Sequence, residues 1–261
     1  MARKPYRVTV QYPTFNQLIY GDTDAGKTTY CASAQDHPEM ANVLFANIEG
    51  GLLSIAHRGD IHAEDIKSAD ELEELAWRIA QGEFETVNTL AVDNITELQT
   101  LDLQQTVAEA IKGGRNRVKN RARTVDDVWQ EDYLKSTNRL LRLFRMLRDL
   151  PINVIFTAHL KRVYPKVAEG TDMNTIDPVA IVPALSQKLM MSTMGMMDFV
   201  WCLEKDEEGV RFAVTTSKGE YRCKTRGPRF LKAIGDVVVN PNLPELYDTF
   251  VRTAHRKKRK V

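Results

Sequence analysis

Gly21-Asp22-Thr23-Asp24-Ala25-Gly26-Lys27-Thr28-Thr29 fits the pattern G-x-x-x-x-G-K-[ST] at each fixed position. Residues 15–20 before it are typical of a short strand, and residues 29–34 after it can begin a helix. A loop closed by glycines turns successive backbone N–H groups toward one point, and the following helix directs its positive end there. The stretch therefore predicts a phosphate-binding loop between a strand and a helix, rather than a chance glycine turn.

The residue types in this loop predict their own contacts with a nucleotide. Lys27 is expected to neutralise the β- and γ-phosphates, and the Thr28 hydroxyl to join the Mg²⁺ shell. We therefore expect ATP and Mg²⁺ as ligands. The predicted nucleotide-binding residues are Gly21, Asp22, Thr23, Asp24, Ala25, Gly26, Lys27, Thr28 and Thr29.

Three apolar runs farther along the chain have strand length and end in polar side chains. Residues 43–48 lead into Glu49, residues 89–92 into Asp93, and residues 152–158 into His159. Continuous apolar runs are typical of parallel strands covered on both faces, whose carboxyl ends meet at the ligand-binding edge of an open α/β sheet. An acid after an apolar run is common, and a lone histidine is more often structural. Following a phosphate-binding loop, however, Asp93 is expected at the Mg²⁺ and His159 as a sensor beside it.

The bulk composition names no partner, but the charge is unevenly distributed. The formal net charge is +1, while residues 252–261 hold six Lys/Arg and no acid, so the rest carries 1 − 6 = −5. Such a tail suits a polyanion, a nuclear-import signal or a merely solvated terminus. The three cysteines form no C-x-x-C pair, which argues against structural zinc and favours a reducing compartment. No apolar run approaches the ~20 residues that span a bilayer, so no membrane association is expected.

We expect one α/β domain with two appended segments. The predicted divisions are an N-terminal segment at 1–14, a core at 15–240, and a C-terminal helix with the basic tail at 241–261. Within the core, the basic loop 112–124 is either an exposed flexible loop or a phosphate-contacting one. Residues 160–185 show no clean periodicity, as expected of a long functional loop.

The second half of the core carries further patterns. Residues 125–150 predict a long helix whose arginines, including Arg139 and Arg142, form a solvated face or a subunit contact. A methionine cluster at 190–197 is typical of adaptable packing. Runs at 199–203, 210–216 and 220–223 predict antiparallel strands.

Four strand-end motifs, GDTDAGKTT, ANIEGGL, TLAVDN and VIFTAHLKR, occur in one order. Their order and spacing resemble the RecA/RadA recombinase-type ATPase core over about residues 15–230, and look most like short phage-encoded RecA-like proteins linked to single-strand annealing. The resemblance implies a RecA-like α/β core, with a mainly parallel central sheet flanked by helices and antiparallel strands near the C-terminus.

The resemblance also implies roles for particular residues. Glu49 matches the glutamate that orients the attacking water, Asp93 matches the Mg²⁺-associated acid, and His159 stands where RecA has a γ-phosphate-sensing glutamine. Residues 160–183 correspond to a DNA-binding loop. Lys224-Thr225-Arg226-Gly227 looks like the Lys-x-Arg-x-Gly element of RadA-type proteins, so Lys224 and Arg226 are expected to reach a neighbouring subunit's nucleotide.

The resulting expectation is an ATPase that assembles on single-stranded DNA and promotes annealing or recombination. The implied partners are single-stranded DNA, further copies of the chain in a ring or filament, and a single-strand-binding protein as a candidate. The implied location is the cytoplasm, that of the host if the protein is phage-encoded. Two alternatives stay open: an ATP-gated accessory or loader protein acting through a protein partner, and a generic P-loop NTPase acting on a small molecule.

Overall fold

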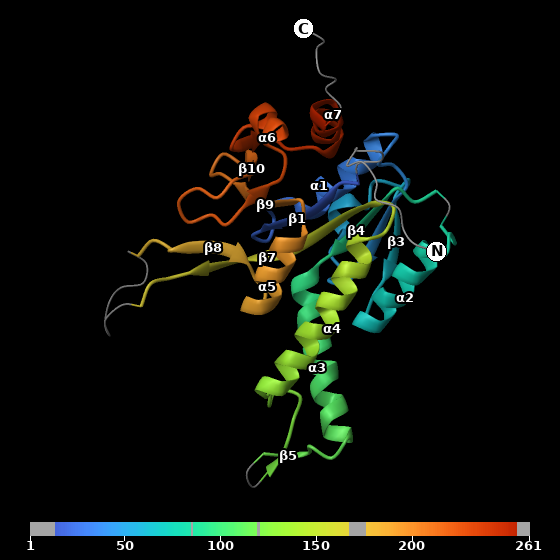
Figure 1. Cartoon of the computed structure of the whole chain (residues 1–261), viewed down its shortest axis with the longest axis vertical. Coiled ribbons are helices and arrows are strands. Elements are labelled where there is room, and N and C mark those ends of the chain that lie inside the picture. The colour runs from blue at the N-terminus through green and yellow to red at the C-terminus, as the bar shows by residue number, and fades with distance from the viewer. Residues whose placement is uncertain (1–13, 85, 119–120, 167–175, 255–261) are drawn as a thin grey trace, which may run out of the picture.

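The apolar runs of the sequence form neighbouring strands of one sheet in the computed structural model, which describes residues 14–84, 86–118, 121–166 and 176–254 (Figure 1). Within those residues the sheet has ten strands, and its main path runs β12-β10-β9-β1-β7-β4-β2-β3. The strands of this path are β1 (Asn16–Gly21), β2 (Val43–Asn47), β3 (His62–Asp65), β4 (Thr89–Asp93), β7 (Asn153–Val163), β9 (Phe199–Lys205), β10 (Arg211–Val214) and β12 (Val237–Val239).

The sheet has a parallel centre and an antiparallel margin. Strands β9, β1, β7, β4, β2 and β3 are parallel neighbours. Strand β10 runs antiparallel to both β9 and β12, and β11 (Lys224–Thr225) runs antiparallel to the start of β9. The predicted fold class, a mainly parallel sheet with antiparallel strands near the C-terminus, is therefore confirmed.

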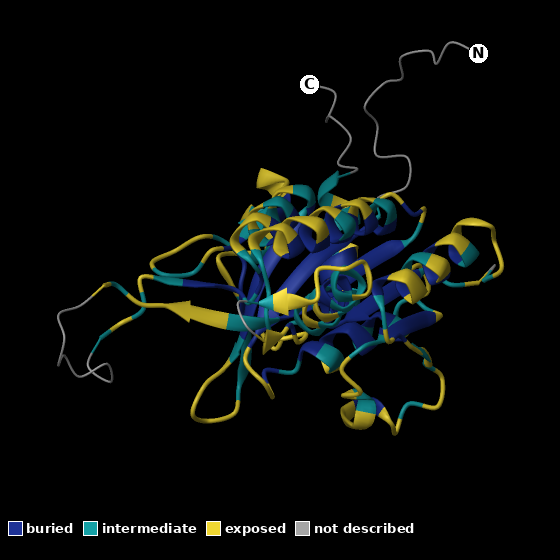
Figure 2. Cartoon of the chain, turned by 90° about the horizontal axis from the view of Figure 1, so that it is seen from below, coloured by how far each residue is buried: buried dark blue, intermediate teal, exposed yellow. Residues whose placement is uncertain are grey.

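Alternation along each central strand sends side chains to two separate cores, one on each face of the sheet. Leu18 and Tyr20 of β1 belong to the first core, whereas Ile19 belongs to the second. The first core is covered by α2 (Ala69–Ala80), α3 (Ile95–Lys112), α4 (Gln130–Arg148) and α5 (Gln187–Met196). The second is covered by α1 (Lys27–Ala32), α6 (Pro228–Ile234) and α7 (Leu243–Ala254). Figure 2 shows the buried sheet between these layers.

The C-terminal helix α7 covers the range predicted for an amphipathic helix and packs through aromatic rings. Phe250 lies 5.8 Å from Phe15 and 5.5 Å from Phe199, measured between ring centroids. Phe230 of α6 adds a further edge contact to Phe250 at 5.7 Å. Segments far apart in the sequence thus share one aromatic cluster beneath β1 and β9.

Two predictions for the second half of the chain are wrong: the start of one helix and the presence of one strand. The helix expected at 125–150 begins only at Gln130, because the Trp129 backbone N–H donates to Asp132 Oδ2 at 2.7 Å and fixes the start of α4. Residues 220–223 form no strand. Ser217 Oγ donates to the Cys223 carbonyl at 2.8 Å and accepts from its N–H, which closes the segment into a loop before β11.

Residues 160–163 and 180–183, within the stretch expected as a loop, form a two-stranded β-ribbon. Strand β7 continues to Val163 and pairs antiparallel with β8 (Ala180–Pro183), in a register that sets Leu160 opposite Pro183. Figure 1 shows this ribbon projecting beyond the sheet. Residues 167–175 of the predicted DNA-binding loop lie outside the described residues.

The basic loop 112–124 lies at the far end of α3 and α4, where β5 (Arg117–Val118) pairs with β6 (Arg121–Ala122) (Figure 1). Arg123 is fully buried, forms an ion pair with Asp132, and places its guanidinium 3.9 Å from the Trp129 ring centroid. Arg115 and Arg121 also pair with carboxylates of the same chain, Glu131 and Asp127. All three arginines thus pair with carboxylates nearby in the same chain, while Arg115 and Arg121 stay 54% and 60% exposed. Contact of this loop with phosphate stays a prediction.

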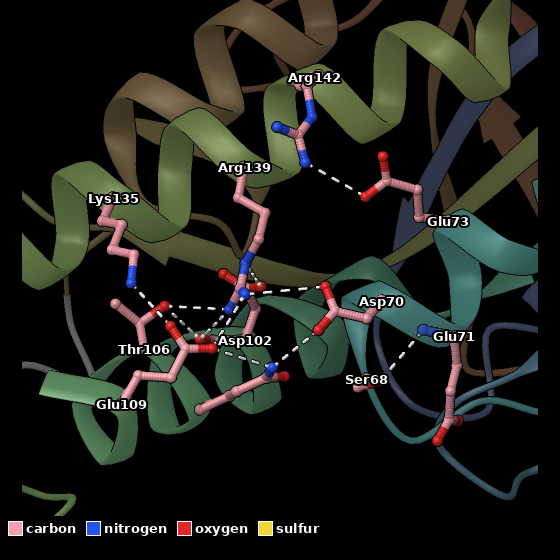
Figure 3. Close-up of polar contacts among 11 residues, drawn as sticks. Ser68, Asp70, Glu71, Glu73, Asp102, Thr106, Glu109, Lys135, Arg139 and Arg142 are labelled. Carbon is pink, nitrogen blue, oxygen red and sulfur yellow. Dashed lines mark hydrogen bonds and ion pairs between the residues drawn. The ribbon is translucent and has the colours of Figure 1, made fainter. Parts of the chain in front are cut away.

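Arg139, one of the arginines expected on a solvated face or at a subunit contact, lies between helices of its own chain (Figure 3). Its Nε is 2.6 Å from Oδ1 of Asp102, a carboxylate with no exposed side-chain surface. Burial raises the pKa of Asp102, and the hydrogen bond from Ser136 together with the Arg139 charge opposes that rise. Arg142, by contrast, is 68% exposed and contacts Glu73 at 3.3 Å. The ion pairs of Arg139 therefore join α3 to α4 in the interior.

No helix within the described ranges combines the length and apolarity that crossing a membrane requires. Residues 1–13 and the basic tail 255–261 lie outside the described residues.

Candidate functional site

The loop after β1 requires glycine at two positions. A Cβ at Gly21 would overlap the Leu203 carbonyl oxygen of the neighbouring β9. Gly26 has φ 90°, in the region that favours glycine, and precedes the first turn of α1. The loop is closed by a hydrogen bond from the Ala25 N–H to the Asp22 carbonyl at 3.2 Å. The two glycines of the motif are therefore required by the fold of the loop.

Lys27 is buried beneath this loop. Its ammonium donates to the carbonyls of Gly21 at 3.0 Å and Asp22 at 2.8 Å. Burial lowers the pKa of Lys27, and the charges of Asp93 and Glu49 oppose that shift. An ammonium held by two neutral carbonyls keeps one donor and most of its charge for an incoming anion.

Thr28 and Asp93 meet at the carboxyl end of β4. Thr28 Oγ1 donates to Asp93 Oδ2 at 2.7 Å, and Thr157 of β7 donates to the other carboxylate oxygen. The described residues contain no group of three or more His, Cys, Asp or Glu side chains placed to hold a metal. A hydroxyl and one carboxylate nonetheless fit Mg²⁺, which keeps several waters and is completed by substrate phosphates rather than by an all-protein cage.

Glu49 and His159 come together through Asn94. His159 Nε2 lies 3.1 Å from Glu49 Oε1, and Asn94 Nδ2 lies 3.2 Å from the same histidine nitrogen while also donating to Glu49. Asn94 is held in turn as the N-cap of α3, with its Oδ1 accepting from the Glu97 N–H at 2.8 Å. Sequence reasoning missed Asn94, although an asparagine directly between a strand-end acid and a helix is a capping signal.

Parallel register explains why these residues converge. Gly21 is opposite His159 across the β1–β7 pair, and Asn47 is opposite Asp93 across the β2–β4 pair. The strand ends surround a cavity of about 320 Å³. The predicted residues that line it are Thr23, Asp24, Gly26, Lys27, Thr28, Thr29, Glu49, Asp93 and His159.

Arg211 is a second residue of this cavity that sequence reasoning missed. It begins β10, far from the loop in sequence, and reaches the site because β10 pairs with β9 and β9 with β1. The Gly209 turn before it, with φ 86°, marks a hairpin but does not indicate what the hairpin approaches. Pairing across three strands is what brings this cation to the cavity.

Two loop acids are tied to neighbouring elements. Asp22 accepts from Arg162 of the ribbon at 2.7 Å, and Asp24 accepts from Lys205 of β9 at 2.6 Å. The Lys205 hydrogen bond and charge hold the pKa of Asp24 below its usual range. The loop is thus connected directly to the β7–β8 ribbon.

Lys224 and Arg226 lie away from this cavity. They flank the start of β9, whereas the loop lies beyond its end, because Lys224 pairs with Val200. Lys224 Nζ donates to the Met194 carbonyl at 2.6 Å, and Arg226 donates to Asp198 Oδ1 at 2.8 Å. Burial lowers the pKa of Lys224, and the nearby Arg226 charge adds to that shift. Neither cation contacts the loop cavity of its own chain.

Comparisons with known proteins show the family of the chain. A family model described as an AAA domain matches residues 15–227, which include every strand that borders the site. A solved structure titled a RadB recombinase aligns at 16% identity and a TM-score of 0.42, covering 76% of this chain and 79% of that one. So distant a likeness indicates neither substrate nor partner. No curated protein gives a significant match to the chain.

Proposed function

The chain belongs to the AAA-domain family, and from that premise we propose that it is a RecA-like ATPase that acts on single-stranded DNA in annealing or recombination. The observation that carries the proposal is the convergence of Lys27, Thr28, Glu49, Asp93 and His159 on one cavity. That set supplies a phosphate-binding cation, oxygen ligands for Mg²⁺, and a carboxylate for water. Such a combination suits hydrolysis of a nucleoside triphosphate.

The loop and Lys27 are proposed to bind the phosphates. The ammonium, now held by the carbonyls of Gly21 and Asp22, is available to the β- and γ-phosphates. Thr28 Oγ1 and Asp93 would hold Mg²⁺, which when bound neutralises charge on the phosphate oxygens. The Thr157 hydroxyl keeps the Asp93 carboxylate oriented from β7.

Glu49 is proposed to activate the attacking water. The water oxygen bonds to the γ-phosphorus, the bond from that phosphorus to the bridging oxygen of ADP breaks, and a proton of the water passes to Glu49. Asn94 and His159 hydrogen-bond the carboxylate and hold it at the cavity. Positioning and charge stabilisation supply most of the rate in this chemistry.

His159 is proposed to link the nucleotide to the ribbon. It lies on β7, and its carbonyl accepts from the Ala184 N–H just after β8 at 2.8 Å. The exposed ribbon carries Lys161 and Lys166, and the 40%-exposed ring of Tyr164. Cations and an aromatic face together suit single-stranded DNA, whose phosphates bind cations and whose bases stack on aromatic rings.

Assembly is proposed to complete the site. Lys224 and Arg226 are too far along β9 to serve their own nucleotide, and this supports a role at a neighbour's nucleotide in a ring or filament. Arginines supplied in this way raise rates by about 10³–10⁵. Turnover is therefore expected to be slow in the monomer. A phage origin, a cytoplasmic location and a single-strand-binding protein as partner belong to the same proposal.

A second candidate function is supported by an exposed apolar patch between α4 and α5. Tyr133, Leu134 and Met191 are 46%, 52% and 63% exposed, and they line a groove. Exposed apolar side chains that are contiguous mark protein-interaction sites. An ATP-gated accessory or loader protein would use this patch to bind a protein partner.

One experiment separates these functions. ATP turnover is measured with and without single-stranded DNA, alongside particle size and DNA affinity at several salt concentrations. The proposed function predicts larger particles, faster turnover with DNA, and affinity that falls steeply with salt. An ATP turnover rate that is the same with and without DNA at every salt concentration would favour an accessory protein or a small-molecule NTPase.

A further inference from the structure

Arg211 holds a buried donor that no described residue satisfies. Its Nε–H is shielded from solvent and has no hydrogen-bond partner among the described residues. Native structures seldom leave such a donor unpaired, because the lost hydration is not recovered. Since no described residue supplies the acceptor, water or a ligand is left to provide it.

The position of the guanidinium favours a ligand. A Cβ added to Gly26 would lie 2.5 Å from Arg211 Nε and 2.8 Å from its Cδ, so this side chain lies directly against the phosphate-binding loop. The loop carboxylate Asp24 is held by Lys205 at 2.6 Å and leaves Arg211 without an ion pair in the described residues. A guanidinium that is close to the loop and free of a carboxylate suits a phosphate group.

The strand that carries Arg211 is firmly placed. The Arg211 carbonyl accepts from the Asn240 N–H at 2.7 Å, and Asp206 Oδ1 accepts from the Val210 N–H at 2.7 Å. These bonds fix the backbone on both sides of the side chain. The backbone of Arg211 is therefore fixed beside the loop by its own sheet.

Arg211 also borders a second cavity of about 200 Å³. This cavity shares Gly26, Thr29 and Arg211 with the loop cavity. Its remaining lining mixes polar and apolar residues: Tyr30, Ser33, Leu203, Asn240, Pro241 and Asn242. Amide and hydroxyl groups beside apolar surface suit a nucleoside, which has polar edges and flat faces.

We propose that Arg211 binds the phosphates of a nucleoside di- or triphosphate from within the same chain, where the phosphates leave the loop cavity and the nucleoside enters the second cavity. The inference rests on the proposed nucleotide site and adds a specific contact to it. Two parallel N–H donors of the guanidinium would contact one phosphate, and the buried Nε–H is one of them. Arg211 thereby differs from Arg226, which is proposed to act between subunits.

The test measures ATP and ADP affinity by calorimetry with the full chain. Arg211→Ala should weaken both nucleotides about ten- to hundredfold, since a hydrogen bond between charged groups is lost. Arg211→Lys should recover little of the lost nucleotide affinity, because lysine lacks the planar guanidinium with its paired N–H donors. Arg229→Ala, an exposed arginine on α6 outside both cavities, serves as the matched control and should bind as the unmodified chain does.

The outcomes distinguish this inference from the proposed function. If Lys27→Ala loses ATP while Arg211→Ala binds normally, Arg211 has no phosphate contact and the ATPase proposal stands. If the unmodified chain binds neither nucleotide, both fail. Should Arg211→Ala not fold, Arg211→Lys decides the question, and affinity near that of the unmodified chain overturns the inference.

A mixing experiment tests the same-chain assignment. Chains carrying Arg211→Ala are mixed with chains carrying Lys27→Ala, and ATP turnover is measured. No recovery is expected, because each site then lacks one of its own cations. Recovery would place Arg211 at a neighbour's nucleotide and overturn the inference.

Discussion

At the scale of single residues, Glu49 shows how the pairing of strands brings a residue to the cavity. The sequence places Glu49 two residues past β2, at the carboxyl edge of the sheet. Its contacts with Asn94 and His159 hold it at the cavity edge, while Lys27 and Asp93 lie at the same cavity. Two neighbours therefore orient the carboxylate at the cavity, as the proposed activation of water requires.

Glu49→Gln should retain ATP binding and lose about 10²–10⁴ in turnover, because the amide fills the same space but cannot take a proton. ATP affinity and single-turnover hydrolysis are measured separately. Glu245→Gln on the exposed side of α7 is the control. Hydrolysis by Glu49→Gln at the normal rate would show that another group activates the water.

At the scale of elements, one interior ion pair joins α3 to α4. Asp102 has no exposed side-chain surface and Arg139 is 15% exposed (Figure 3). A charge buried in this way is tolerated only with its partner present. The pattern of arginines along α4 gave no indication of which one faces α3.

Arg139→Ala should lower the free energy of unfolding by about 3–5 kcal/mol, since Asp102 is left buried without its counter-ion. Arg142→Ala, on the same helix but with an exposed contact to Glu73, should cost about 1 kcal/mol or less. Urea unfolding followed by circular dichroism measures both variants. Equal destabilisation by the two would mean that the Asp102 pair contributes no more than a surface contact.

The β7–β8 ribbon is the element proposed to hold single-stranded DNA. Replacing Lys161 and Lys166 together by alanine should weaken DNA binding and make the slope of log affinity against log salt shallower by about 1.4, or 0.7 per phosphate contact. Lys218→Ala combined with Lys232→Ala, at two exposed lysines outside the ribbon, is the control with the same loss of two charges. Fluorescence anisotropy over a salt series gives the slopes, and slopes that stay unchanged would exclude the ribbon as the DNA contact.

At the scale of the whole molecule, the phosphate site and the Lys224–Arg226 pair occupy opposite ends of β9. Leu203 is paired with Gly21 at one end, and Val200 is paired with Lys224 toward the other. In the proposed assembly, Lys224 and Arg226 of each chain would contact the nucleotide of a neighbouring chain. The nucleotide of each chain would in turn be contacted by the Lys224 and Arg226 of another subunit. Hydrolysis would then report assembly.

Arg226→Ala alone should hydrolyse ATP slowly, and mixing it with Lys27→Ala chains should restore part of the turnover. The second chain lacks a working loop but supplies an intact Arg226. Thermal unfolding of Arg226→Ala is needed as a control, because Arg226 also binds Asp198 and the Gly195 carbonyl. Mixtures that stay as slow as their components would argue against action between subunits.

The sequence alone determined the parts that depend on short stretches. The glycine-lysine loop, the apolar runs of β1, β2, β4 and β7, and the polar residues at their ends were all readable from local patterns, because strand length, burial and turn geometry depend on neighbouring residues. The parallel sheet followed, since buried strands alternating with helices have few other arrangements. These patterns fixed the fold class and the edge at which the site lies.

Only the tertiary structure decided which distant residues join that edge. Arg211 reaches Gly26 through the pairing of β10 with β9 and β9 with β1, and Arg139 of α4 pairs with Asp102 of α3. The ribbon forms because β7 pairs with β8, although the sequence between and around them shows no periodicity. Such contacts depend on strand register and helix packing between segments far apart in the chain, and a local pattern carries no record of either.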